Sequence, residues 1–335
     1  MTILVTGGLG FIGSHTVVEL INQGHECVII DNLSKSTIDV VNRIEMVTHK
    51  KVSFIKVEML DKTAIRKVFQ QFSISAVIHF AGYKSVGESV KQPLLYYQNN
   101  LFSTLNLLDV MQEFAVKKLV FSSSATVYGD TSIPPLTENL PLSAPNPYGR
   151  SKLMLEEILR DLVEANTEWS VALMRYFNPI GAHTSGLLGE MPYDTPNNLM
   201  PHVLKVASGE SAKLQIFGGD YETLDGSCIR DFIHIMDLAK GHVKALQYVE
   251  QHTGCEAFNI GTGVGYSVLS LLRTFEIVTG EKVPYEIINR REGDIVISIA
   301  DVQKAENMLN WKAQYQLEDM CVDSWRWYQS IKGYV

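Results

Sequence analysis

The sequence predicts an α/β fold, in which a doubly wound parallel sheet is joined to a smaller C-terminal α/β domain. Apolar runs of strand length alternate with helix-like segments over residues 1–180, a pattern typical of strands that helices cover on both faces. After residue 181 this alternation loosens into turns rich in Gly, Pro and Asn. A chain of 335 residues is long enough for two domains, which we expect at 1–180 and 181–335.

The predicted elements follow one another in βα order. The first strand, "TILVTG", leads into a helix at "SHTVVELINQG" that stops at a glycine, and "ECVIID" is the second strand. Further strands are expected at "VSFIKVEM", "AVIHFAG", "KKLVFSSS" and "SVALMRYFN", separated by helix-like segments such as "LFSTLNLLDVMQEFA". Two later strands, "CIRDFIHI" and "EAFNIG", indicate that a segment at about 228–260 returns to the first domain. A helix-like tail, "LEDMCVDSWRWYQS", closes the chain.

Composition narrows the class of protein. The net charge of −8 and the pI near 5.6 provide no basic footprint for nucleic acid. No apolar run approaches the length of a membrane span, and the N-terminus enters a strand without a signal peptide. The four cysteines, Cys27, Cys228, Cys255 and Cys321, have no metal-type spacing. We therefore expect a cytoplasmic protein with reduced thiols and no metal, acting on a small molecule rather than on a membrane or nucleic acid.

A glycine motif opens the first predicted helix. Gly7, Gly10 and Gly13 in "TGGLGFIG" follow the first strand directly, where glycine permits a tight turn and lets the backbone approach a pyrophosphate at the helix N-terminus. Asp31 ends the second strand, 18 residues after Gly13. A carboxylate there binds ribose hydroxyls and repels a 2′-phosphate, so the motif predicts a Rossmann-type site for NAD rather than NADP.

A second motif, "NPYGRSK", places Tyr148 four residues before Lys152 at the start of a predicted helix. This spacing puts both side chains on one face, and alone it is common by chance. Beside a nicotinamide it acquires a meaning, because a nearby ammonium and the oxidised ring favour the phenolate, which then removes a proton from a substrate hydroxyl. Ser124, at the end of "KKLVFSSS", is expected to bond the same hydroxyl.

The glycine motif, the strand-end serine and Tyr-x-x-x-Lys in this order resemble the extended short-chain dehydrogenase/reductase superfamily. Within it the whole chain is similar to the UDP-glucose 4-epimerases, in the stretches "LVTGGLGFIGSHT", "VIHFAGYKSVGESV", "FSSSATVYGD", "PYGRSK", "LMRYFNPIGAH", "NNLMPHV", "RDFIHIMDLAKGHVKAL", "FNIGTGVGYSVL" and "RREGD". The resemblance implies an isomerase with tightly bound NAD that oxidises carbon 4 of a UDP-hexose to a transient ketone, lets the sugar turn, and reduces its other face.

The resemblance also implies which residues bind. The expected cofactor contacts, besides Gly7, Gly10, Gly13 and Asp31, are Phe11, Ile12, Asn32, Leu33, Ser34, Lys35, Ser36, Glu58, Met59, Phe80, Ala81, Gly82, Lys84, Asn99, Ser122, Tyr148, Lys152 and Phe177. The expected UDP-sugar contacts are Lys84, Ser124, Tyr148, Asn178, Asn198, Leu199, Gln215, Ile216, Phe217, Arg230, Arg291, Asp294 (in the stretch 291–294) and Ser298. Arginines suit a diphosphate because their fork binds it bidentately.

Some positions depart from the family pattern. Val57 and Glu58 stand where relatives have Gly-Asp, which puts the adenine contact, and so the NAD affinity, in doubt. Ser298 stands at the spacing of a tyrosine in members restricted to glucose and galactose, so we expect room for an N-acetyl group and activity on UDP-N-acetylglucosamine and UDP-N-acetylgalactosamine. A side chain from "IVISIAD" or from the loop 192–196 that fills this room is the alternative.

Two other functions are weighed. A nucleotide-sugar 4,6-dehydratase shares the fold and the first step but carries Thr-Asp-Glu where Ser124, Ala125 and Thr126 stand here. A redox-sensing binding module would commonly lack the Tyr148–Lys152 pair.

The resemblance finally implies a homodimer in which helices at about 88–114 and 149–166 pack against the same helices of the second subunit. Apolar residues on more than one face of these segments are consistent with such a contact. Galactose metabolism and the supply of sugars for surface polysaccharides are the expected roles.

Overall fold

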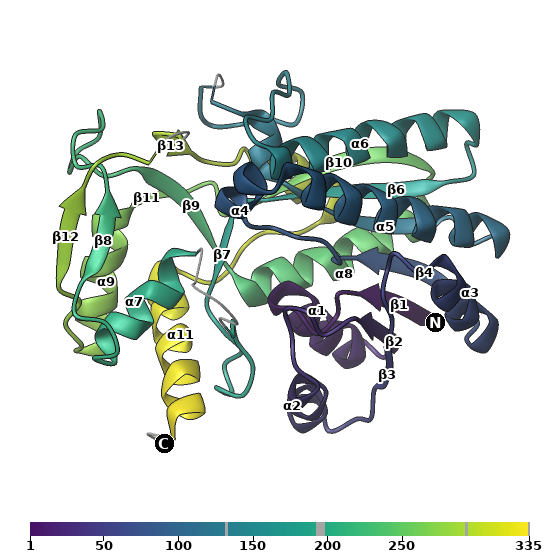
Figure 1. Ribbon diagram of the computed structural model, residues 1–335, viewed down its shortest axis with the longest axis horizontal. Helices are drawn as coiled ribbons and strands as arrows, with labels where there is room; N and C mark the ends of the chain where they lie inside the picture. The colour runs from purple at the N-terminus through teal and green to yellow at the C-terminus, as the bar shows by residue number, and fades with distance from the viewer. Residues whose placement is uncertain (131–132, 192–197, 292–293, 334–335) are drawn as a thin grey trace.

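A seven-stranded parallel sheet forms the centre of the molecule (Figure 1), in a computed structural model that describes residues 1–130, 133–191, 198–291 and 294–333. The strand order is β10-β6-β5-β4-β1-β2-β3. From β1 the chain adds β2 and β3 on one side and then β4, β5, β6 and β10 on the other, and β1 and β4 are parallel. The predicted doubly wound parallel sheet is therefore confirmed. Its strands are β1 (Thr2–Thr6), β2 (Glu26–Asp31), β3 (Ser53–Lys56), β4 (Ile74–His79), β5 (Lys118–Ser124), β6 (Ser170–Tyr176) and β10 (Gly254–Ile260).

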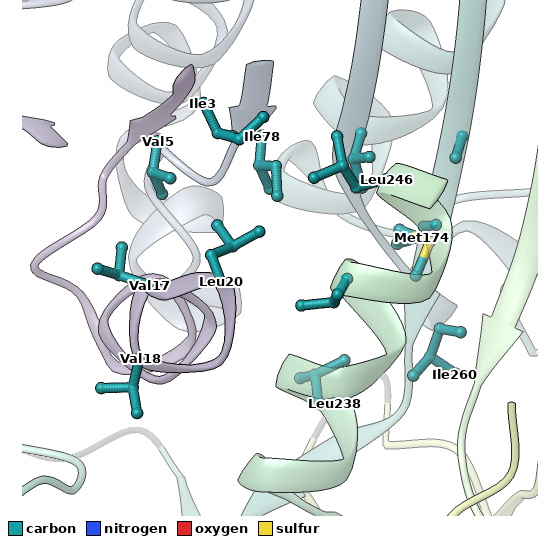
Figure 2. Close-up of a cluster of buried hydrophobic side chains, with 14 of the residues drawn as sticks. Ile3, Val5, Val17, Val18, Leu20, Ile78, Met174, Leu238, Leu246 and Ile260 are labelled. Carbon is teal, nitrogen blue, oxygen red and sulfur yellow. The ribbon is translucent and has the colours of Figure 1, made fainter. Parts of the chain in front are cut away.

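Helices cover both faces of this sheet, because consecutive residues of its inner strands are apolar and buried, and their side chains point alternately to the two faces. Ile3 and Val5 of β1 face one cluster, whereas Leu4 between them faces the other. Figure 2 shows the first cluster, where Val17 and Leu20 meet side chains of the sheet. The helices of the first cluster are α1 (Phe11–Asn22), α2 (Asp39–Thr48) and α8 (Ile235–Gln251), and those of the second are α3 (Lys62–Gln71), α5 (Pro93–Glu113) and α6 (Pro147–Ala165). The short α4 (Val86–Lys91) precedes α5, and the 3₁₀ helix η1 (Ala125–Tyr128) follows β5.

The remaining elements form a smaller body beside the sheet (Figure 1). Strand β9 pairs with three short strands, and β8 pairs with β12 in parallel. The strands are β7 (Asn178–Ile180), β8 (Leu214–Phe217), β9 (Ile229–His234), β11 (Gly265–Ser267), β12 (Tyr285–Ile288) and β13 (Ile297–Ser298), and the helices are α7 (Leu199–Ala207), α9 (Val268–Thr279) and α11 (Leu317–Lys332). Helix α10 (Gln303–Leu309) packs instead on the large body, against α8 and β10. A third apolar cluster lies between α7, α9 and α11.

The segment predicted to return to the sheet divides between the two bodies. Strand β9 belongs to the small sheet, whereas α8 packs on the large sheet and β10 forms its edge beside β6. The domain boundary at residue 180 remains an interpretation of this arrangement. Within the described ranges, no helix is both long and apolar enough to cross a membrane.

Candidate active site

A cavity of about 340 Å³ lies at the carboxyl ends of the central strands, where a doubly wound sheet places its ligands. It is lined by the loops after β1, β2, β3 and β4, by Ser122 of β5, by α6, and by residues 188–191. Most predicted contacts are brought together there: Gly7, Gly10, Phe11, Ile12, Gly13, Asp31, Asn32, Ser34, Lys35, Ser36, Glu58, Met59, Phe80, Ala81, Gly82, Lys84, Asn99, Ser122, Tyr148, Lys152 and Asn198.

The glycine turn packs too closely for side chains. Gly7 has φ +64°, and a β-carbon there would lie 2.7 Å from the backbone nitrogen of Ala81. At Gly13 a β-carbon would lie 2.4 Å from the carbonyl oxygen of Gly7. Helix α1 then begins after Gly10 with no side-chain cap and no acidic residue in its first turn. Its first amides and its positive dipole end are therefore available to an anion, as a pyrophosphate requires.

Asp31 ends β2 with its carboxylate facing the cavity. Its Oδ1 atom accepts from the Leu33 amide (2.9 Å) and the Ser36 hydroxyl (2.8 Å), and its Oδ2 atom accepts a longer bond from the Leu9 amide (3.2 Å). An ionised carboxylate has about four acceptor sites, so capacity remains for ribose hydroxyls. Glu58, which departs from the family pattern, accepts a hydrogen bond from the side-chain amide of Asn32 at 2.8 Å.

Tyr148 and Lys152 lie in the first two turns of α6, which begins here because Asn146 caps it and Pro147 occupies its first position. The Asn146 side chain accepts from the Gly149 amide at 2.9 Å. The Lys152 ammonium donates to the Ser122 carbonyl oxygen at 2.6 Å and lies over the Phe121 ring. The Ser122 carbonyl thus holds the Lys152 ammonium at the end of β5, beside the tyrosine.

The electrostatics of this pair differ from the sequence expectation. Burial raises the pKa of Tyr148, while a hydrogen bond with Ser124 and the charge of Lys84 act to lower it. Lys152, expected to be that cation, has its own pKa lowered to about 8 by burial, with Glu156 opposing the shift. The Lys152 ammonium is directed at the Ser122 carbonyl, and the charge that lowers the Tyr148 pKa is that of Lys84. In the protein alone the phenol is therefore protonated, and further positive charge is needed to make it a base.

A second set of predicted residues lies outside this cavity. Arg291 is ion-paired with Asp294 at 2.7 Å and lies over the ring of Phe217, and Ser298 pairs with Arg230 between β13 and β9. These residues share the small body with the predicted sugar contacts on β7, α7 and β8. The members outside the lining are Leu33, Ser124, Phe177, Asn178, Leu199, Gln215, Ile216, Phe217, Arg230, Arg291, Asp294 and Ser298, and the predicted stretch 292–293 and the loop 192–196 fall outside the described residues.

The cavity also contains residues that sequence reasoning missed. Arg43, Tyr176, Glu190 and Trp327 line it from α2, β6, the segment before α7, and α11. No local motif marks them, because they reach the cavity only through long-range packing: the Trp327 indole donates to the Glu190 carbonyl oxygen at 3.4 Å, and Arg43 lies over the Trp327 ring. The one available signal was the position of Glu190, seven residues before the start of "NNLMPHV".

A dinucleotide cradle, a Tyr-x-x-x-Lys pair and a strand-end serine at one sheet edge define an extended short-chain dehydrogenase/reductase. The sequence matches the NAD dependent epimerase/dehydratase family over residues 3–261. It is 56% identical over 335 residues to a UDP-glucose 4-epimerase of Bacillus subtilis, covering 100% of this chain and 99% of that protein. The chain therefore belongs to this family and, within it, to the UDP-glucose 4-epimerases, which are isomerases.

Two solved structures resemble the whole chain. The UDP-glucose 4-epimerase from Stenotrophomonas maltophila, with bound NAD and formylated UDP-arabinopyranose, has a TM-score of 0.98 at 46% identity and covers 100% of both chains. The enzyme from Bifidobacterium longum, in complex with NAD⁺ and UDP, has a TM-score of 0.96 at 48% identity and covers 99% of both chains. The predicted family, enzyme class and NAD dependence are confirmed, and the glycine turn, the α1 terminus and Asp31 fit this cofactor.

Proposed function

We propose that this chain interconverts UDP-glucose and UDP-galactose at the cavity beside α6, with Tyr148 as the acid–base group. The observation that carries the proposal is the meeting of two kinds of residue in one cavity. Gly7, Gly13 and Asp31 supply a dinucleotide cradle, and Tyr148 and Lys152 supply proton-transfer chemistry. NAD, when bound there, supplies the acceptor and donor of hydride that the inversion of carbon 4 requires.

The residues divide the remaining work. Tyr148 takes the proton of the carbon 4 hydroxyl and returns it, and Ser124, which shares a hydrogen bond with Tyr148, orients that hydroxyl. Lys152 is held by the Ser122 carbonyl at the end of β5. The charge of Lys84 lowers the pKa of the Tyr148 phenol, which burial has raised. A dehydratase would need an Asp–Glu acid–base pair at positions 125 and 126, where this chain has Ala125 and Thr126.

The UDP part is proposed to bind at the small body. Arg230 and Arg291 provide guanidinium groups for the diphosphate, and Asp294 provides acceptors for ribose hydroxyls. The present partners of Arg291 are Asp294 and the Phe217 ring, so these side chains already lie together. Firm anchoring at the nucleotide leaves the hexose free to turn and present its other face.

The N-acetylated UDP-sugars are proposed as further substrates, because position 298 carries a serine. Ser298 is 8% exposed on β13 and lacks the ring that a tyrosine would add at this point. An acetamido group adds about three heavy atoms, and forcing these into a filled site costs about 1–3 kcal/mol. A serine avoids that cost. The proposed roles in galactose metabolism and in supplying surface polysaccharides follow from these substrates, in the cytoplasm, where NAD and UDP-sugars occur together.

A homodimer through α5 and α6 is also proposed. These helices pack against each other on one side of the molecule (Figure 1). Leu94 and Phe102 on α5 are 72% and 55% exposed, and Met154 on α6 is 39% exposed. Large apolar side chains gathered on neighbouring helices are typical of a surface that a partner covers, here a second copy forming a four-helix contact.

The function is tested with the purified protein and no added cofactor. We expect it to carry NAD and to convert UDP-galactose to UDP-glucose, measured by a coupled assay for UDP-glucose. A protein that holds NAD but converts neither sugar, alone or with added NAD, contradicts the proposal.

A further inference from the structure

Glu190 occupies a position in the cavity that the reaction outlined above does not use. Its Oε1 atom lies 3.1 Å from the Lys84 ammonium and accepts a hydrogen bond from the Asn198 amide at 2.7 Å. The carboxylate side chain is 17% exposed, whereas Lys84 is 59% exposed. One acidic group thus joins two residues that we place around the hexose, and it neutralises the charge of Lys84.

The backbone holds this carboxylate in place. The Trp327 indole of α11 donates to the Glu190 carbonyl oxygen at 3.4 Å. The preceding Gly189 lies flat on the same ring, where a β-carbon would come within 2.4 Å of the indole. Arg43 of α2 donates to the Leu187 carbonyl oxygen at 3.2 Å. Two distant helices thus hold the backbone of residues 187–190, and the Glu190 carboxylate itself is held by its bonds to Lys84 and Asn198.

Glu190 lies at the reacting end of the cavity. The charge of its partner Lys84 lowers the pKa of the Tyr148 phenol, so Lys84 lies within electrostatic reach of the group that acts on carbon 4. The other charged groups at this end are engaged elsewhere: Glu88 accepts from the Tyr96 hydroxyl at 2.7 Å, and Lys152 donates to the Ser122 carbonyl. Lys84 and Lys152, the two lysines beside Tyr148, are therefore both already engaged.

The exocyclic carbon 6 of the sugar must lie close to Glu190 and Lys84. It is attached to carbon 5, which is bonded to the reacting carbon 4. Because the sugar presents both faces in turn, the substituent visits both sides of the site during each reaction cycle. A neutral hydroxymethyl group can donate to a carboxylate, whereas an ionised carboxylate at the same point would be repelled by it.

We propose that Glu190 is a specificity-determining residue that excludes UDP-hexuronic acids, whose carbon 6 is a carboxylate. The proposal rests on the proposed function, since it assumes that carbon 4 lies at Tyr148. Glu190 acts in two ways: it occupies Lys84, the cation that a uronate would seek, and it presents a like charge to the incoming carboxylate. Neutral hexoses are unaffected by this penalty.

The test compares two substrates on the same holoenzyme. The ratio of kcat/KM for UDP-glucuronate to that for UDP-galactose is measured in wild type, Glu190→Gln and Glu190→Asp. The glutamine keeps the shape and the bond to Asn198 but frees Lys84, so we expect the ratio to rise by about 10-fold or more. The aspartate keeps the charge and should keep discrimination. Glu88→Gln is the matched control, because it removes a carboxylate from the same cavity without touching Lys84.

Each outcome decides the proposal. A ratio that rises in Glu190→Gln but not in Glu88→Gln supports it. An unchanged ratio in Glu190→Gln, an equal rise in Glu88→Gln, or a wild type that converts UDP-glucuronate as well as UDP-galactose overturns it. Should Glu190→Gln fail to fold, the wild-type comparison and Glu190→Asp still decide. Calorimetric binding of both UDP-sugars separates this proposal from the proposed function: a protein without epimerase activity fails the latter, while the ratio of Kd values still tests Glu190.

Discussion

Replacing Gly13 with alanine should dislocate the dinucleotide cradle. The added β-carbon would lie 2.4 Å from the Gly7 carbonyl oxygen and 2.8 Å from the Gly8 α-carbon, whereas ordinary contact begins at 3.4 Å. The turn at Gly7 and the start of α1 must therefore separate by about 1 Å, the difference between 2.4 Å and 3.4 Å. Gly7 is not free to retreat, because it abuts the backbone of Ala81.

The magnitude follows from this displacement. Overpacking of this size costs about 1–3 kcal/mol of stability. A shift of the same size misaligns the α1 amides, and losing one charge-assisted hydrogen bond to a phosphate costs about 1.5–3 kcal/mol. We therefore expect NAD affinity to fall by about 10- to 100-fold, since each 1.4 kcal/mol is tenfold.

The assay measures NAD released per chain on denaturation of the purified protein, together with its Tm. Gly87→Ala is the control, because a β-carbon at Gly87 of α4 has no atom within 4 Å and alanine favours a helix. We expect the control to retain NAD and Gly13→Ala to lose it. Full NAD occupancy and an unchanged Tm in Gly13→Ala would refute the argument.

Three further predictions follow from other regions. Ser298→Tyr should lower turnover of UDP-N-acetylgalactosamine by about 10-fold while sparing UDP-galactose; equal effects on both sugars would show that this position is not the gate. Phe102→Glu should convert the dimer to a monomer by light scattering at micromolar concentration, and a wild type that is already monomeric contradicts the interface. Stability should fall in mild acid, because burial lowers the pKa of His15 and His79 to about 3 and of His242 to about 4, from 6.5. Protonation then favours the unfolded chain, so stabilisation present above pH 6.5 is lost as the pH falls, by roughly 2 kcal/mol per histidine at pH 5. Urea unfolding at pH 7 and pH 5 measures this loss, and equal midpoints would contradict it.

Local patterns predicted much of the fold and the cradle. Buried parallel strands read as continuous apolar runs. A strand, a glycine turn and a helix are neighbours in sequence, so Gly7, Gly13 and Asp31 were expected at one site, and they line one cavity. The assignment of β9 to the small sheet was not predicted, because an apolar strand does not reveal its partner.

The electrostatics of the site depended on tertiary contacts. Spacing placed Lys152 beside Tyr148, but only the packed structure shows the ammonium bonded to the Ser122 carbonyl and Lys84 acting on the phenol. Glu190 was missed for the same reason, since its place is set by Trp327 and not by any neighbour in sequence.

The central claim is that Tyr148 moves the proton at a site where NAD remains bound. The most direct test is the turnover of UDP-galactose by Tyr148→Phe, measured on protein whose NAD content and UDP affinity match those of wild type. General acid–base catalysis contributes about 10²- to 10⁴-fold, so turnover should fall by that factor or more while both ligands stay bound. Turnover near the wild-type rate in this variant would contradict the assignment of Tyr148 as the catalytic acid and base.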